Sequence, residues 1–195
     1  MTATGWWAVV TGRELSQGDV LPGLEVPRVP ALPDHGAGRA EIEVVVETVD
    51  LDVIVLTQTC DLEHAKQEEV LVGRVVTWID FVAAQVAAGN QAVRSREFAR
   101  NLRNGTIPPL HLLRHHDGDP ALPWSLVHFR ELHTVARSQL EGHAARQHTR
   151  LRLHSPYREH LGQAFARFFM RVGLPLDVGD FERTGPEQAK QVTTE

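Results

Sequence analysis

Residues 53–56, the run Val-Ile-Val-Leu, constrain this chain more than any other segment because they contain no polar position. A short run of branched apolar residues is typical of a strand that is buried on both faces. Just before it, Ile42, Val44 and Val46 alternate mainly with glutamates, which is the period-two pattern of a strand with one solvated face. We predict a turn at residues 50–52 between the two strands. The chain must therefore build its core around a β-sheet.

The segments on either side of this run predict further strands and one long irregular connection. Residues 6–10 and 70–76 are rich in valine, which favours strands. Residues 21–40 predict a loop or, at most, an edge strand, because they contain many residues that break regular structure: Pro22, Gly23, Pro27, Pro30, Pro33, Gly36 and Gly38. The first part of the chain is therefore expected to be mainly β.

Three helices are predicted in the second part of the chain. Thr77 is a suitable N-cap for a helix of about three turns, and a more basic helix follows over residues 91–103. Ser155 and Pro156 suit the N-cap and the first position of a last helix, which Gly173 ends. Apolar residues recur along this last helix at three- and four-residue spacings, so one of its faces is expected to join the core.

The segment between these helices is less regular. Residues 110–113 and 125–129 predict two strands that are joined through an Asp-Gly turn, and residues 151–153 predict another strand. Residues 127–134 predict the junction between a strand and a helix.

Length and composition are those of an ordinary globular protein. The chain has 195 residues, of which 42% are hydrophobic and 23% charged, so it has enough apolar material for a core. We predict a single α+β domain over residues 1–183 and a disordered polar tail over 184–195. In this fold, a small curved β-sheet or SH3-like barrel at 5–76 packs against helices at 77–103 and 155–173.

Charge is unevenly distributed along the chain. Residues 1–90 carry 14 acidic and 5 basic side chains, whereas residues 91–175 carry 6 acidic and 13 basic ones, all of them arginines. Arginine recognises phosphate and carboxylate groups with its planar fork, so nucleic acid is one candidate partner. The alternatives are a genomic base-composition bias and packing of the acidic part against the basic part.

The cysteine content and the hydropathy of the chain bear on its location. The chain has one cysteine, which excludes an intrachain disulfide, and no stretch is long and apolar enough for a membrane span. The first ten residues lack the basic and apolar regions of a signal peptide. We therefore predict a cytoplasmic protein with no membrane partner.

The sharpest local feature is the polar segment that follows the buried strand. Gln58, Cys60 and Asp61 are packed closely at its end, so we select them as candidate catalytic residues. Three interpretations of Cys60 remain open: a buried structural residue, a nucleophile paired with a histidine, and a metal ligand. For the last, Cys60 and His64 are four residues apart, and a zinc site would need further ligands from elsewhere. No other cofactor is predicted.

Two other groups of residues are candidates for binding. His111, His115 and His116 precede Asp117 and Asp119, and predict either a solvated hairpin or a pair of metal ligands.

A basic stripe is the second group. Arg96, Arg100 and Arg103 have the spacing of one helical face, which suits either a solvated surface or contacts with the phosphates of a nucleic acid.

Two resemblances accompany these patterns. Gly18-Asp19-Val20 after the first strand, then the breaker-rich loop and strands at 53–58 and 70–76, resemble over residues 6–76 the SH3-like barrel of MazF/PemK-type toxins. That resemblance implies RNA endonuclease activity. The segment Thr57-Gln58-Thr59-Cys60-Asp61-Leu62 is similar to uncharacterised bacterial proteins with a Ser/Thr-Gln-x-Cys-Asp-Leu motif at a strand end, which implies a bacterial source and marks a site without naming a reaction.

From these observations we predict a cytosolic bacterial binding or accessory module whose polar site lies at the end of the 53–57 strand, with an unidentified protein partner. Two alternatives remain: a thiol- or metal-dependent enzyme that uses Cys60 and histidines, and a toxin-like RNA-binding protein or ribonuclease that uses the arginine-rich second half.

Overall fold

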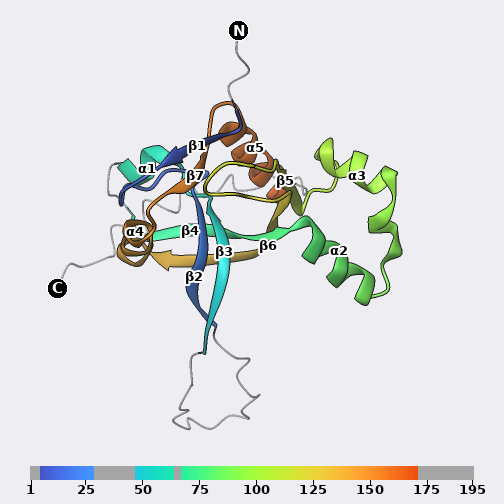
Figure 1. Ribbon diagram of the computed structural model, residues 1–195, viewed down its shortest axis with the longest axis horizontal. Coiled ribbons are helices and arrows are strands. Elements are labelled where there is room, and N and C mark those ends of the chain that lie inside the picture. Colours follow the sequence, from blue (N-terminus) through green and yellow to red (C-terminus); the bar gives the residue numbers. More distant parts are fainter. Residues whose placement is uncertain (1–4, 29–46, 64–66, 171–195) are drawn as a thin grey trace, which may run out of the picture.

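Two antiparallel sheets form the centre of the protein in the computed structural model, which describes residues 5–28, 47–63 and 67–170 (Figure 1). The larger sheet has the order β2-β3-β4-β6-β5, and the smaller pairs β1 with β7. The strands are β1 (Trp7–Val10), β2 (Val20–Arg28), β3 (Glu47–Val55), β4 (Glu69–Thr77), β5 (Leu110–Leu113), β6 (Ser125–Ala136) and β7 (Arg150–Leu153).

The structure corrects the predicted turn at residues 50–52, which lie in the middle of β3. Asp50 and Asp52 tolerate this position because the first half of β3 pairs with β2 in a ribbon whose outer positions are exposed. The Asp52 carboxylate also accepts a hydrogen bond from the Gly23 backbone N–H at 2.9 Å, where the register of β2 shifts. β2 is an edge strand despite Pro22 and Gly23, as predicted. The predicted strand residues 42–46 lie outside the described residues.

The predicted 127–134 junction is also wrong, because these residues belong to one continuous strand, β6. β6 pairs with β4 along its length, and a register shift between Gly73 and Arg74 accommodates a bulge in β6. The helix that follows, α4, begins only at residue 137. β6 stays extended as far as Ala136 because it pairs with β4 up to Glu69. The local sequence of residues 127–134 does not show this pairing.

Helices lie at the sides and end of these sheets (Figure 1). They are α1 (Thr59–Glu63), α2 (Trp78–Ala87), a 3₁₀ turn at Gln91–Arg94, α3 (Arg96–Arg103), α4 (Arg137–Arg146) and α5 (Tyr157–Phe169). The Thr77 cap of α2 is confirmed, since its hydroxyl accepts the Asp80 N–H at 3.1 Å.

Two predicted helix boundaries are corrected. The helix predicted over 91–103 is interrupted at Ser95, whose hydroxyl accepts the Phe98 N–H at 3.0 Å and so caps α3. Ser155 does not cap α5: the helix begins after Pro156 and has no side-chain cap. The predicted end of this helix at Gly173, like the predicted tail at 184–195, lies outside the described residues.

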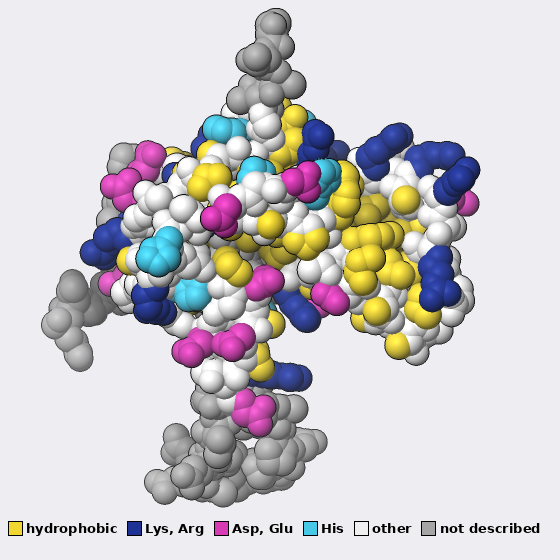
Figure 2. Space-filling view, in the orientation of Figure 1, with side chains coloured by type: hydrophobic (Ala, Val, Ile, Leu, Met, Phe, Trp, Pro, Cys, Tyr) yellow, Lys and Arg dark blue, Asp and Glu magenta, His cyan; other side chains and the backbone are white. Residues whose placement is uncertain are grey.

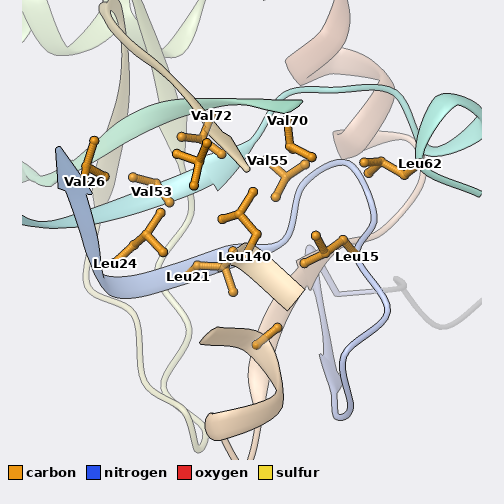
Figure 3. Close-up of a cluster of buried hydrophobic side chains, with 12 residues drawn as sticks. Leu15, Leu21, Leu24, Val26, Val53, Val55, Leu62, Val70, Val72 and Leu140 are labelled. Atoms are coloured by element: carbon orange, nitrogen blue, oxygen red, sulfur yellow. The ribbon is translucent and has the colours of Figure 1, made fainter. Parts of the chain in front are cut away.

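The core is divided into three clusters of buried side chains. One lies between β2, β3, β4 and α4, where Leu140 points from α4 toward the sheet (Figure 3). A second joins the small sheet to α5 through Trp7, Phe129 and Leu161. The third cluster, around Phe81 and Leu102, packs α2 and α3 against β5 and β6. We call α2, the 3₁₀ turn and α3 the lobe. The apolar stripe of α5 is thereby confirmed as a core face over its described part.

The two sheets meet at Gly18, which hydrogen bonds to both. Its N–H donates to the Val55 carbonyl at 2.9 Å, and its carbonyl accepts the Leu153 N–H at 3.1 Å. Gly18 has a φ of +86°, and a Cβ there would lie 2.8 Å from the Cβ of Leu153. Only glycine therefore fits at this crossing without displacing β7.

A buried ion network lies beside this crossing. Asp19 and Arg150 are both 0% exposed, and Arg150 Nε donates to Asp19 Oδ2 at 3.0 Å. Arg152 also donates to both carboxylate oxygens of Asp19, and its hydrogen bond with Asp19 raises the pKa of the Arg152 guanidinium. The remaining arms of Arg150 donate to the carbonyls of Gly12 and Glu14.

The α+β class is confirmed, with α2 to α5 in the second part of the chain and sheets that are not closed into a barrel. Within the described ranges, no helix is long and apolar enough to cross a membrane.

We expect Asp19→Asn to destabilise the protein strongly, because it leaves the buried Arg150 charge unpaired. Removing one partner of a buried ion pair costs about 3–5 kcal/mol. The free energy of unfolding in urea measures this loss, and the matched control is Asp50→Asn, an exposed aspartate on β3 that should change stability by less than about 0.5 kcal/mol. Equal effects of the two variants would contradict a structural role of the network.

Candidate cationic cleft

A cleft of about 770 Å³ opens between the end of α3, β5 and α5. Its basic side chains come from three different parts of the chain. They are Arg103, His111, Arg114, His160 and Arg167. None of the described residues that line the cleft is acidic. The described lining therefore carries basic side chains without a carboxylate among them.

The three arginines of the cleft are exposed. None of them forms a salt bridge within residues 5–28, 47–63 and 67–170. Arg103 and Arg167 make only local contacts, to the Asn104 side chain at 3.4 Å and the Gln163 carbonyl at 3.3 Å. Their guanidinium groups keep most donors available for an anion.

Aromatic rings form another part of the lining. Trp6 and Tyr157 stack with centroids 4.2 Å apart and an angle of 16° between their planes. Trp124 is 45% exposed and packs against His115, with 4.9 Å between the ring centroids. Partly exposed rings beside unpaired arginines offer flat surfaces on which another planar group can stack.

His111 is the most perturbed titratable group of the cleft. Its pKa is lowered to about 4, mainly by burial and also by electrostatic repulsion from His160 and Arg167. The imidazole is therefore neutral near pH 7. Its ring packs against the ring of Phe129, with 6.3 Å between the two centroids. Neither ring nitrogen of His111 hydrogen bonds to any described residue.

The fold explains why these residues converge. β7 leads directly into α5 and pairs with β1, so Trp6 and Tyr157 meet at the ends of neighbouring strands. The Trp7 indole N–H donates to the Arg114 carbonyl at 2.9 Å, which fixes the segment after β5 against β1. Phe98 and Leu102 hold α3 against the core of the lobe, and Arg103 at the end of the helix lines the cleft.

The polar segment after β3 lies outside this cleft. Thr57 and Thr59 have structural partners: Thr57 Oγ1 accepts the Leu71 N–H at 2.8 Å, and Thr59 Oγ1 lies 2.9 Å from Ser16 Oγ. Gln58 and Cys60 are exposed, so the structure does not place Cys60 in the core. Asp61 is half-buried.

The neighbours of the Cys60 thiol are oxygen atoms. Its sulfur lies 3.7 Å from Gln58 Oε1 and 3.9 Å from Asp61 Oδ1. In the described part of the chain no histidine hydrogen bonds to it. His64 lies outside the described residues, and residues 5–28, 47–63 and 67–170 hold no group of three side chains placed to bind a metal. The zinc site and the catalytic roles of Gln58, Cys60 and Asp61 stay predictions.

The three predicted nucleic-acid-binding arginines lie together on α3. Arg96, Arg100 and Arg103 are all exposed, and the opposite face of the helix is held by Leu102 in the core of the lobe. Arginine side chains gather along the edge of this lobe, beside a patch of hydrophobic side chains (Figure 2). Arg103 belongs both to this stripe and to the cleft.

Sequence patterns did not identify most of the cleft. Trp6, Arg114, Trp124 and Arg167 occur in no common motif, and the segments that carry them are far apart in the chain. The excess of arginine over residues 91–175 was the only available signal, and it did not distinguish these arginines from the paired ones.

No protein-family model matches the chain, and no curated protein matches it.

We expect His111 to titrate near pH 4 in the folded protein and near its ordinary value of about 6.5 when unfolded. The unfolded chain then binds a proton that the folded chain does not, so folding stability falls as the pH drops from about 6.5 toward about 4. Imidazole shifts by NMR in native and urea-denatured protein measure both values. A folded value at or above 6.5 would contradict the described environment.

We expect the Cys60 thiol to react with a thiol reagent in the native protein to the same extent as in urea, because its side chain is exposed. Mass spectrometry of the labelled chain measures this, with Cys60→Ser as the blank. Labelling that requires urea would show that Cys60 is covered in solution and would exclude it as a nucleophile.

Proposed function

We propose that the protein is a binding module whose cleft holds a nucleotide unit, with the phosphate on the arginines and the base on the aromatic rings. The observation that carries this proposal is the lining itself, in which three unpaired arginines stand beside Trp6, Trp124 and Tyr157, with no acidic side chain among the described residues.

The charge of the cleft supports a phosphate in preference to a neutral ligand. Guanidinium groups bind phosphate oxygens through pairs of parallel hydrogen bonds, which are stronger than those between neutral groups. Several of them without a counter-charge raise the local concentration of anions.

The electrostatic surroundings of His111 fit the same anionic ligand. Two of the causes that lower its pKa, beyond burial, are the positive groups His160 and Arg167. A bound phosphate would offset their charge and raise the pKa of His111, so protonation of this ring would add a donor to the anion.

Size and shape support a ligand with a planar group. Small-molecule sites have volumes of about 300–1,000 Å³, and the cleft, at about 770 Å³, falls in that range. Stacking of a base on an aromatic ring contributes about 1–3 kcal/mol and requires no specific hydrogen bonds. The cytoplasm, the predicted location of this chain, contains such ligands both free and in RNA.

The alternatives that the sequence predicted have less support. A site at Gln58, Cys60 and Asp61 has an exposed thiol, but no histidine among the described residues hydrogen bonds to it, and its neighbours are oxygen atoms of Gln58 and Asp61. A protein partner stays a prediction, and so does RNA cleavage.

We expect 5′-AMP and 5′-UMP to bind more tightly than adenosine or ribose 5-phosphate, because only the nucleotides engage both the arginines and the rings. Calorimetric titration measures each affinity. Arg114→Gln combined with Arg167→Gln should weaken nucleotide binding at least about tenfold, since a hydrogen bond to a charged group contributes about 1.5–3 kcal/mol.

The matched control is Arg28→Gln combined with Arg146→Gln, two exposed arginines outside the cleft. It should bind nucleotides like the unmodified protein. Equal losses in both double variants, or no nucleotide binding at all, would contradict the proposal.

A further inference from the structure

The arginine stripe of α3 continues beyond the cleft. Arg96, Arg100 and Arg103 have i, i+4 and i+7 spacing, so they lie on one face of the helix. All three are exposed, and none forms a salt bridge with the described part of the chain. The surface of α3 is therefore basic along this face, although the helix also carries the exposed Glu97 in its first turn.

Arg103 connects the two regions. It is the last residue of α3 and lines the cleft, whereas Arg96 is the first residue of the helix. Their seven-residue separation spans about 10 Å along the helix axis. A nucleotide in a stacked strand covers only about 3.4 Å, so one nucleotide in the cleft leaves the rest of the stripe unused.

Resting on the proposed function, we infer that the ligand is a single-stranded nucleic acid, with one unstacked nucleotide in the cleft and the adjoining phosphates on Arg96 and Arg100. A duplex does not fit this arrangement, because its bases are stacked on each other and cannot reach Trp6, Trp124 or Tyr157. Proteins that bind single strands without reading sequence combine a basic track with aromatic platforms in this way.

The orientation of the helix is consistent with such a track. The opposite face of α3 is fixed in the lobe by Phe98 and Leu102, and Ser95 caps its first turn. The stripe is thus held rigidly relative to the cleft, and its arginines need no rearrangement of the backbone to contact a strand.

The test compares ligands of increasing length on the full chain. The probes are 5′-UMP, a fluorescein-labelled ten-nucleotide oligouridylate, the matching oligothymidylate, and the oligouridylate annealed to its complement. We expect the single strands to bind at least tenfold more tightly than 5′-UMP and than the duplex, as measured by fluorescence anisotropy and competition. Comparison of the oligouridylate with the oligothymidylate shows whether RNA is preferred to DNA.

Arg96→Gln combined with Arg100→Gln separates the stripe from the cleft. This variant should bind the oligonucleotide more weakly and bind 5′-UMP unchanged, and it should reduce the slope of log affinity against log salt by about 1.4, at about 0.7 for each lost phosphate contact. The control is again Arg28→Gln with Arg146→Gln. Circular dichroism and thermal melting establish that both variants are folded.

The outcomes distinguish the inference from the function on which it rests. If 5′-UMP binds but the oligonucleotide binds no better, or if the α3 variant binds both normally, the single-strand inference is overturned and the nucleotide site stands. If neither binds, both fail. If polyglutamate of equal charge displaces the oligonucleotide as effectively as unlabelled oligouridylate, the surface selects charge alone, and the inference is overturned.

Discussion

The side chains of Asp19 and Arg150 have no access to solvent. Among the described residues, the Asp19 carboxylate is stabilised by Arg150, Arg152 and the Ser16 N–H, and the Arg150 guanidinium by Asp19 and the carbonyls of Gly12 and Glu14. A pair in this situation tolerates little displacement, because the loss of one partner leaves an unsolvated charge. The network lies where Gly18 hydrogen bonds to β3 and to β7, and it therefore holds the small sheet against the large one. Because β1 and β7 carry Trp6 and α5 at their ends, the position of one wall of the cleft depends on this buried interaction.

Two sets of arginines in the second half have different environments. Arg137, Arg150, Arg152 and Arg158 are paired with carboxylates. Those of the cleft and of α3 are not paired within the described ranges. The two interpretations of the charge asymmetry are therefore compatible: some of the basic side chains stabilise the fold, and others are available for a ligand. A guanidinium that already satisfies a buried carboxylate contributes little to recognition, whereas an exposed one beside an aromatic ring contributes both charge and shape.

Local patterns predicted elements wherever one segment carried the whole physical cause. Val53, Ile54 and Val55 are fully buried on β3, an inner strand of the large sheet, as their apolar run indicated. Thr77 caps α2, and the described part of the α5 stripe packs in the core, since capping and helical periodicity act over a few residues. The predictions failed where a distant partner decided the outcome. Asp50 and Asp52 are strand residues because β2 pairs beside them, and residues 127–134 remain extended because β4 does.

The sequence by itself determined the α+β composition, the central buried strand, the excess of arginine and the helical stripe of Arg96, Arg100 and Arg103. Each of these properties depends on residues that are close in the chain. Only the tertiary structure decided that Arg103 meets Arg114, Arg167 and three aromatic rings in one cleft, that the Cys60 thiol is exposed, and that Asp19 is buried between two arginines. These relations depend on the pairing of β1 with β7 and on the packing of α3 and α5. Strand pairing and helix packing join residues more than a hundred positions apart, and no local pattern records which ones will meet.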